Sequence, residues 1–144
     1  MKTTLVGRID RGFHLLPVRV YYEDTDAGGV VYHANYLKFC ERGRTDFLRV
    51  LGINQSELND LLFVVRRMDC DFRRPAKLDD LLEVRSRFLE MAGARLELDQ
   101  EVRRDGEVLF QASVTAALID RQGRPRRLPA ELAGRIKSLS ESAP

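Results

Sequence analysis

The chain has 144 residues, of which 32% are charged and 44% hydrophobic, and its formal net charge at pH 7 is +2. This length fits one domain, because two cores drawn from so short a chain would each be too small. The small net charge gives no reason to expect nucleic-acid binding. Cys40 and Cys70 form no CxxC pair and no disulfide framework, which is typical of a reduced, cytosolic protein.

The N-terminal segment has no continuous apolar stretch, so we expect no signal peptide. No apolar run reaches the roughly 20 residues that cross a bilayer, so any work near a membrane is expected at its surface. Residues 1–14 lack a clear period and predict a loose N-terminal arm, with His14 as an ordinary loop residue. A strand follows, in which Val18, Val20 and Tyr22 share one face.

A turn then leads into a long amphipathic helix. The turn is DTDAGG, residues 24–29, a sequence rich in turn-forming residues. Asn35 is a suitable N-cap for the helix, and Gly52 is a natural stop. Gly43 lies on the apolar stripe of the helix and indicates close packing against a sheet. The whole stripe is Tyr36, Phe39, Cys40, Gly43, Phe47, Val50 and Leu51.

The remaining chain alternates between apolar and polar residues. After a short helix at 54–61, this pattern predicts strands at 62–72, 81–91, 95–103 and 107–119. In the first of these strands, one parity holds Val64, Met68, Cys70 and Phe72. Such alternation predicts an antiparallel sheet with one covered face, and the long helix is its cover.

The fold class is therefore α+β, a single two-layer domain spanning 1–144. Its basic tail, 121–144, is expected to contain a short helix at 130–140.

The strand-to-helix junction holds the residues with catalytic chemistry. Asp26 lies at the end of a strand and just before a helix. Backbone N–H groups of residues 27–31, with the helix dipole, can stabilise a developing oxyanion. A carboxylate beside them can act as a nucleophile or activate water. His33 can donate a hydrogen bond or carry a proton near neutral pH.

The same residues allow simpler interpretations. Asp24 and Asp26 can cap a turn while His33 packs in a loop. The two acids with the histidine can also be a metal site, although no second cluster completes a coordination sphere. Cys40 is a poor candidate nucleophile, because it lies on the apolar stripe and buried free cysteines are usually inert.

The segment YYEDTDAGGVVYHANYLKFCERGRTDFLR resembles the signature of hotdog-fold acyl-CoA thioesterases of the 4-hydroxybenzoyl-CoA thioesterase type. More narrowly, it resembles their bacterial branch associated with the Tol–Pal cell-envelope system. The similarity continues through FVVRRMDCDFRRPAKLDDLLEV and covers most of the chain. It implies a hotdog, in which an antiparallel sheet wraps a long central helix. It also implies pairing into a dimer with active sites at the subunit interface, often within a homotetramer.

The resemblance also implies roles for single residues. The catalytic carboxylate matches Asp26, and two further site residues match Tyr22 and His33. The oxyanion donor is expected among the N–H groups of Gly28, Gly29, Val30 and Val31. Glu41 is a secondary candidate, with a helix-surface or dimer-contact charge as the simpler interpretation. Arginines and lysines that could bind the CoA phosphates are Arg73, Arg74 and Lys77, with Arg126 and Arg127 as further candidates.

The expected reaction is hydrolysis of an acyl-CoA to a free acid and CoA, in the cytoplasm and without a metal ion or cofactor. One alternative is a hotdog dehydratase or another enzyme that works on acyl carrier protein. The other is a non-hydrolytic protein that binds acyl-CoA or acyl carrier protein as a scaffold at the inner membrane surface. Asp26 and His33 together favour hydrolysis.

Overall fold

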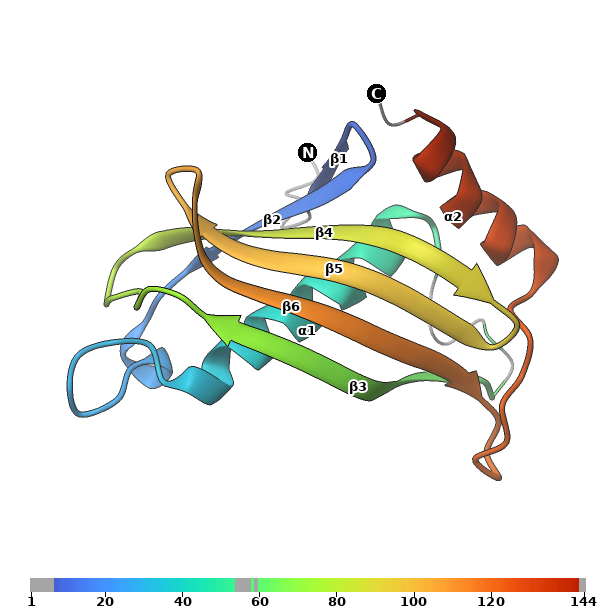
Figure 1. Cartoon of the computed structure of the whole chain (residues 1–144), viewed down its shortest axis with the longest axis horizontal. Coiled ribbons are helices and arrows are strands. Elements are labelled where there is room, and N and C mark those ends of the chain that lie inside the picture. Colours follow the sequence, from blue (N-terminus) through green and yellow to red (C-terminus); the bar gives the residue numbers. More distant parts are fainter. Residues whose placement is uncertain (1–6, 54–57, 59, 143–144) are drawn as a thin grey trace, which may run out of the picture.

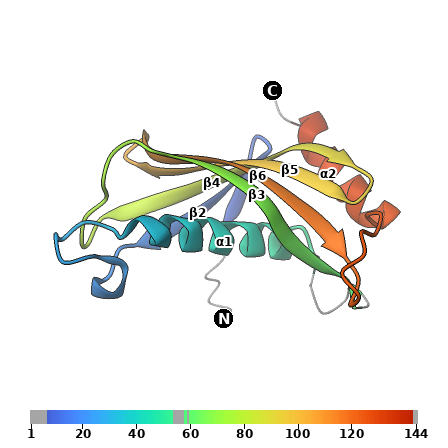
Figure 2. The same cartoon turned by 60° about the horizontal axis from the view of Figure 1, so that its bottom comes forward.

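One long helix lies along one face of an antiparallel sheet in the computed structural model, which describes residues 7–53, 58 and 60–142 (Figures 1 and 2). The strands follow the order β1-β2-β4-β5-β6-β3 across the sheet. Along the chain, the elements are β1 (Arg8–Asp10), β2 (Phe13–Arg19), the 3-10 helix η1 (Tyr22–Asp24), α1 (His33–Val50), β3 (Leu62–Phe72), β4 (Leu81–Ala92), β5 (Arg95–Arg104), β6 (Glu107–Ile119) and α2 (Ala130–Ser142).

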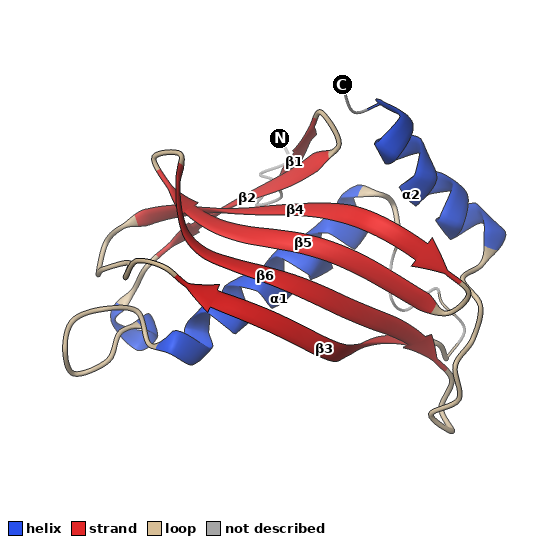
Figure 3. Ribbon diagram, in the orientation of Figure 1, coloured by secondary structure: helices blue, strands red, loops and turns tan. Residues whose placement is uncertain are grey.

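The predicted α+β class and its four long strands are confirmed (Figure 3). Tight turns join β4 to β5 and β5 to β6, and Gly93 and Gly106 adopt positive φ there. The connection from β3 to β4 is longer and crosses to the other side of β5 and β6. The helix predicted at 130–140 forms as α2. The short helix predicted at 54–61 falls largely on residues outside those that the structure describes. Within 7–53, 58 and 60–142, no helix is both long and apolar enough to cross a membrane.

The predicted apolar stripe of α1 faces the sheet. Tyr36, Phe39, Cys40, Gly43 and Phe47 are all buried. At Gly43 the approach is so close that an added Cβ would lie 2.8 Å from Cγ1 of Val84. The contact confirms the packing that the glycine predicted.

The two ends of the strand-to-helix junction differ from the prediction. The strand ends at Arg19, and Tyr22 begins the short helix η1 instead of continuing the strand. Helix α1 begins at His33, before the expected N-cap residue Asn35. Asn35 lies in the first turn, where its side-chain amide donates a hydrogen bond to Asp24 over 3.0 Å. The side chain therefore ties the helix start to η1.

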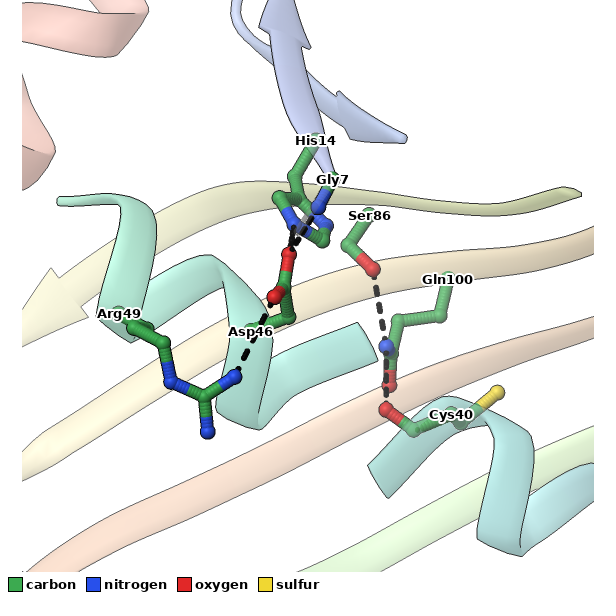
Figure 4. A network of polar contacts seen from close by, with 7 residues as sticks. All are labelled: Gly7, His14, Cys40, Asp46, Arg49, Ser86 and Gln100. Carbon is green, nitrogen blue, oxygen red and sulfur yellow. Dashed lines mark hydrogen bonds and ion pairs between the residues drawn. The ribbon is translucent and has the colours of Figure 1, made fainter. Parts of the chain in front are cut away.

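The N-terminal segment is not a loose arm over the part that the structure describes. Strands β1 and β2 form a hairpin, and His14 is fully buried in it. Nε2 of His14 lies 2.7 Å from Oδ2 of Asp46 on α1, and the N–H of Gly7 donates to the same oxygen over 2.7 Å (Figure 4). The His14 ring also stacks on Phe47, with centroids 4.9 Å apart. These contacts anchor the hairpin to the helix.

A second polar contact crosses the core beside this anchor (Figure 4). Gln100 of β5 is fully buried, and its Nε2 donates to the carbonyl of Cys40 and to Oγ of Ser86, each over 2.9 Å. Its Oε1 accepts a hydrogen bond from Arg44 over 2.9 Å. Because buried polar groups are costly when unpaired, this network fixes α1 against β4 and β5.

Acid pH is expected to destabilise the fold through His14. Burial lowers the pKa of His14 below the ordinary value of 6.5, against the opposing effect of Asp46. Nδ1 is buried without a partner in the described part of the chain, so a protonated ring would bury an unpaired N–H. The unfolded chain then binds a proton at higher pH than the folded one. The stability that comes from keeping His14 neutral in the fold is present above about pH 6.5, and it is lost as the pH falls through the folded-state pKa of His14.

Urea unfolding between about pH 7.5 and about pH 5.5 measures this effect. The wild type should lose more stability over this range than His14→Gln, which does not titrate. An equal loss in both proteins would show that His14 is not the source.

Strand β3 ends the sheet and contains an irregularity that the sequence pattern did not reveal. Its register against β6 shifts between Val65 and Arg67. Directly opposite residues of an antiparallel pair share a face, so Phe63 and Val65 lie on the face of Met68. The assignment of Val64 to that face was wrong, because the bulge reverses the parity upstream of it.

Candidate active site

The loop between η1 and α1 holds the acidic residues of the junction, and the structure separates their roles. Asp24 is buried, and its carboxylate accepts hydrogen bonds from the N–H of Tyr21 over 2.9 Å and from Asn35 over 3.0 Å. It therefore holds the loop in shape. Asp26, two residues later, is exposed.

The Asp26 loop is closed by its own backbone. The N–H of Asp26 donates to the carbonyl of Val30 over 2.9 Å, and the N–H of Gly29 donates to the carbonyl of Asp26 over 3.1 Å. Gly29 has a φ of 82°, which favours glycine. Oδ1 of Asp26 accepts the N–H of Gly28 over 2.8 Å. Within the described residues Oδ2 has no partner, so it can face a substrate or water.

Asp26 and His33 open into the same cavity of about 320 Å³. Tyr36 and Phe72 form its aromatic wall, with ring centroids 5.8 Å apart, and Phe72 lies 6.2 Å from the ring of His33. The cavity thus joins the start of α1 to the end of β3. The complete lining is Asp26, Val30, Val31, His33, Tyr36, Phe72, Arg73, Arg74 and Pro75.

Tyr36 lines this cavity, although its place on the apolar stripe predicted only a core residue. Its hydroxyl oxygen accepts the N–H of Ala76 over 2.9 Å, and its ring stacks on Phe110 at 5.2 Å. Burial raises the pKa of Tyr36, so the phenol stays protonated and can donate a hydrogen bond. The sequence could have placed Tyr36 near His33, because a spacing of three residues puts two side chains on one side of a helix.

Most of the predicted oxyanion donors already have acceptors. The N–H groups of Gly28 and Gly29 donate to Asp26, as described above. The N–H of Val31 donates to the carbonyl of Ala76 over 2.8 Å. Of the four predicted groups, only the N–H of Val30 has no partner in the described part of the chain.

The start of α1, where His33 lines the cavity, holds further open donors. The first N–H groups of a helix have no intrahelical partner, and no side chain caps α1. The N–H of Asn35 donates to the carbonyl of Tyr32 over 2.8 Å, which leaves those of His33 and Ala34. These groups, with the helix dipole, can bind a negatively charged oxygen.

Several other predicted residues lie outside the cavity. Tyr22 is 82% exposed and does not line it. Glu41 is exposed farther along α1, where it lines two different cavities. Lys77, Arg126 and Arg127 are exposed and also do not line it. One chain therefore brings Asp26 and His33 together, but not Tyr22 or Glu41.

Arg73 and Arg74 are at the edge of the cavity, as predicted for residues that bind CoA phosphates. Arg73 is 2.9 Å from Asp71, and Arg74 is 3.5 Å from Glu107. Such exposed pairs are weak, so an incoming phosphate can replace these carboxylates. Within the described residues, no three His, Cys, Asp or Glu side chains are placed to hold a metal ion.

A sheet wrapped around one helix, with a carboxylate and the open start of that helix in one cavity, is the arrangement of a hotdog protein of the thioesterase class. The family model described as "Thioesterase superfamily" matches residues 28–111, and the chain belongs to this family. Acyl-CoA thioesterase YbgC of Haemophilus influenzae is 49% identical over 115 residues, 78% of this chain and 84% of that protein. Acyl-CoA thioester hydrolase YbgC of Escherichia coli O157:H7 is 43% identical over 125 residues, which are 84% of this chain and 93% of that protein.

Solved structures agree with this assignment. A probable thioesterase from Bartonella henselae superposes with a TM-score of 0.79 at 46% identity, over 81% of this chain and 99% of that chain. A thioesterase from Thermus thermophilus, complexed with coenzyme A and Zn, superposes with a TM-score of 0.79 at 28% identity, over 88% of this chain and 93% of that chain. The hotdog fold and the thioesterase family expected from the sequence are confirmed, while the roles of single residues remain predictions.

Proposed function

We propose that this chain hydrolyses an acyl-CoA thioester to a free acid and CoA, with Asp26 as the catalytic carboxylate. One observation carries the proposal: a carboxylate with a free oxygen shares a cavity with the open N–H groups at the start of α1. The names of the YbgC relatives support the substrate class, because both are thioesterases of acyl-CoA.

The reaction follows from this geometry. Oδ2 of Asp26 attacks the thioester carbonyl, or it removes a proton from a water molecule that attacks. Negative charge then develops on the carbonyl oxygen, and the N–H groups of Val30, His33 and Ala34 are the donors that can stabilise it. In the first route CoA leaves as its thiolate, water then hydrolyses the acyl-Asp26 anhydride, and the proton released by that water converts the thiolate to the thiol. In the second route protonated Asp26 returns its proton to the sulfur as the C–S bond breaks, and CoA leaves as its thiol. Both routes restore the Asp26 carboxylate.

The direct test is thiol release from short, long and aromatic acyl-CoA substrates, with the same acyl groups on acyl carrier protein. Release from the CoA panel supports the proposal and identifies the preferred acyl group. Release only from acyl carrier protein would change the carrier but keep the chemistry. A folded protein that releases no thiol from either panel would favour the non-hydrolytic scaffold. Among the described residues, no feature supports a place for such a scaffold at a membrane surface.

Replacing Arg73 or Arg74 with alanine is expected to raise KM for acyl-CoA by about tenfold and to leave kcat nearly unchanged. Each arginine would contact a CoA phosphate in both the ground state and the transition state, so its loss weakens binding uniformly. Arg121→Ala is the matched control, since Arg121 is an exposed arginine that pairs with Asp60 away from the cavity. An equal change in the control would mean that general surface charge is responsible.

We also propose that the enzyme works in the cytoplasm as a homodimer or homotetramer. The thioesterase family and the two cysteines, which form no disulfide framework, support the cytoplasmic location. The edge strand β3, with eleven residues of which none is buried, supports the oligomer, because a long exposed edge can pair with another chain.

A further inference from the structure

The connection between β3 and β4, residues 73–80, runs beside the Asp26 loop (Figure 1). Val30 pairs with Lys77 in an antiparallel bridge. The N–H of Val31 donates to the carbonyl of Ala76 over 2.8 Å, and Ala76 is fully buried. This connection therefore serves as a strand partner for the end of the Asp26 loop.

The pairing sets the direction of the N–H of Val30, one of the open donors described above. In an antiparallel pair, residues that bond to the partner strand alternate with residues whose N–H and C=O groups point away from it. Because Val31 makes the bond to Ala76, Val30 points away from that strand. The carbonyl of Val30 accepts the N–H of Asp26 over 2.9 Å, so the N–H of Val30 points toward the same side. The connection thus aims an open donor toward Asp26.

Tyr36 ties this connection to α1. Its hydroxyl oxygen accepts the N–H of Ala76 over 2.9 Å. The side chain is buried, and its ring contacts Phe110, stacked at 5.2 Å, and Phe72 at 5.8 Å. Close packing of the ring leaves the hydroxyl little freedom to move. The hydroxyl is therefore a fixed point of attachment for Ala76.

The same helix carries the other open donors. The N–H groups of His33 and Ala34 belong to the first turn of α1, and Tyr36 follows them directly in that helix. Through Ala76, Tyr36 fixes the strand that carries Val30 relative to this helix start. Donors that are already in place stabilise a developing oxyanion without the cost of reorganisation. The position of the Tyr36 hydroxyl thus affects both halves of the donor set.

A second attachment holds the connection from the side of the sheet. Oδ2 of Asp80 accepts the N–H of Lys77 over 2.8 Å and a hydrogen bond from Arg104 of β5 over 2.7 Å. This attachment links the connection to the sheet but not to α1. Among the described residues, Tyr36 supplies the side-chain hydrogen bond that joins the connection to the helix.

We propose that Tyr36 is a positioning residue of the oxyanion site, whose hydroxyl holds the N–H of Val30 in place relative to the N–H groups at the start of α1. Tyr36 acts through Ala76 and needs no contact with the substrate. The role rests on the proposed hydrolysis, because the oxyanion forms only when the thioester carbonyl is attacked.

Tyr36→Phe removes the hydroxyl and keeps the ring. We expect kcat for acyl-CoA hydrolysis to fall by about 10- to 100-fold, because displaced donors stabilise the transition state less well, while KM stays nearly unchanged. Tyr21→Phe is the matched control, since Tyr21 is 60% exposed and does not line the Asp26 cavity, and its kcat should equal that of the wild type. Steady-state thiol release measures both constants, and circular dichroism checks folding. An unchanged kcat in folded Tyr36→Phe, or a change in KM alone, would overturn the proposal.

The carbonyl band of a bound substrate distinguishes positioning from general damage to the fold. The acyl-CoA that the wild type hydrolyses fastest, labelled with ¹³C at the thioester carbonyl, is bound to Asp26→Asn to prevent turnover. Hydrogen bonds to the carbonyl oxygen lower its stretching frequency in the infrared spectrum. Adding Tyr36→Phe to this variant should raise the frequency toward that of the free acyl-CoA in water. An unchanged band would show that Tyr36 does not position the donors.

Asp80→Asn tests the same connection without changing the core. The side chain of Asp80 is 23% exposed, and an amide accepts hydrogen bonds less strongly than a carboxylate, so kcat should fall by about threefold or more. If Tyr36→Phe does not fold, an unchanged kcat in folded Asp80→Asn overturns the proposal in its place. A wild type that releases no thiol would instead contradict the hydrolysis itself, so the two failures are distinguishable.

Discussion

Asp26→Asn is expected to lower kcat/KM for acyl-CoA hydrolysis by about 1000-fold or more, with little change in stability. The amide keeps an oxygen that can accept the N–H of Gly28, so the loop retains its shape. It can neither attack the thioester carbonyl nor take a proton from water. The loss should appear in kcat, because the carboxylate acts in the transition state. Thiol release under single-turnover and steady-state conditions measures both constants.

Glu23→Gln is the matched control for this experiment. It makes the same change from carboxylate to amide three residues earlier, at an exposed side chain that does not line the Asp26 cavity. Its activity should stay near that of the wild type. Full activity of Asp26→Asn would move the catalytic role elsewhere, and equal losses in both variants would indicate a general effect of loop charge.

The parts of the fold that could be predicted are those that local sequence determines. Alternation places residues on the two faces of a strand, so β4, β5 and β6 were found within a residue or so of their ends. The apolar stripe found the buried side of α1 in the same way. The junction was also visible, because an acid, two glycines and a histidine within a few residues are unusual in a purely structural turn.

The parts that could not be predicted depend on contacts between distant residues. His14 has no local signal, since its burial depends on Asp46, which follows 32 residues later. Val64 was assigned to the wrong face because a bulge is set by the partner strand. The oxyanion donors depend on which N–H groups are already occupied, and the carbonyl that occupies Val31 belongs to Ala76. Residue types gave the chemistry of the site, and tertiary pairing decides which groups are free to perform it.

Asp46→Ala should lower the free energy of unfolding by about 3 kcal/mol. Oδ2 of Asp46 accepts both the N–H of Gly7 and the contact from Nε2 of His14, and the carboxylate is buried. Its removal leaves two donors without an acceptor, and each such donor costs about 1–3 kcal/mol. Asp46→Asn keeps one acceptor oxygen and should fall between the wild type and alanine. Urea denaturation at about pH 7.5 measures the series, with His14 neutral.

Arg49→Ala separates this anchor from a surface ion pair. Arg49 contacts the other oxygen of Asp46 over 3.4 Å, but its side chain is 62% exposed, so its loss should cost less than about 0.5 kcal/mol. A large loss for Arg49→Ala with a small one for Asp46→Ala would place the stabilisation in the ion pair. The expected order instead assigns it to the buried hydrogen bonds that join the first hairpin to α1. Because this anchor lies near the end of α1 farther from His33, the Asp46 variants should unfold more readily yet keep their kcat while folded.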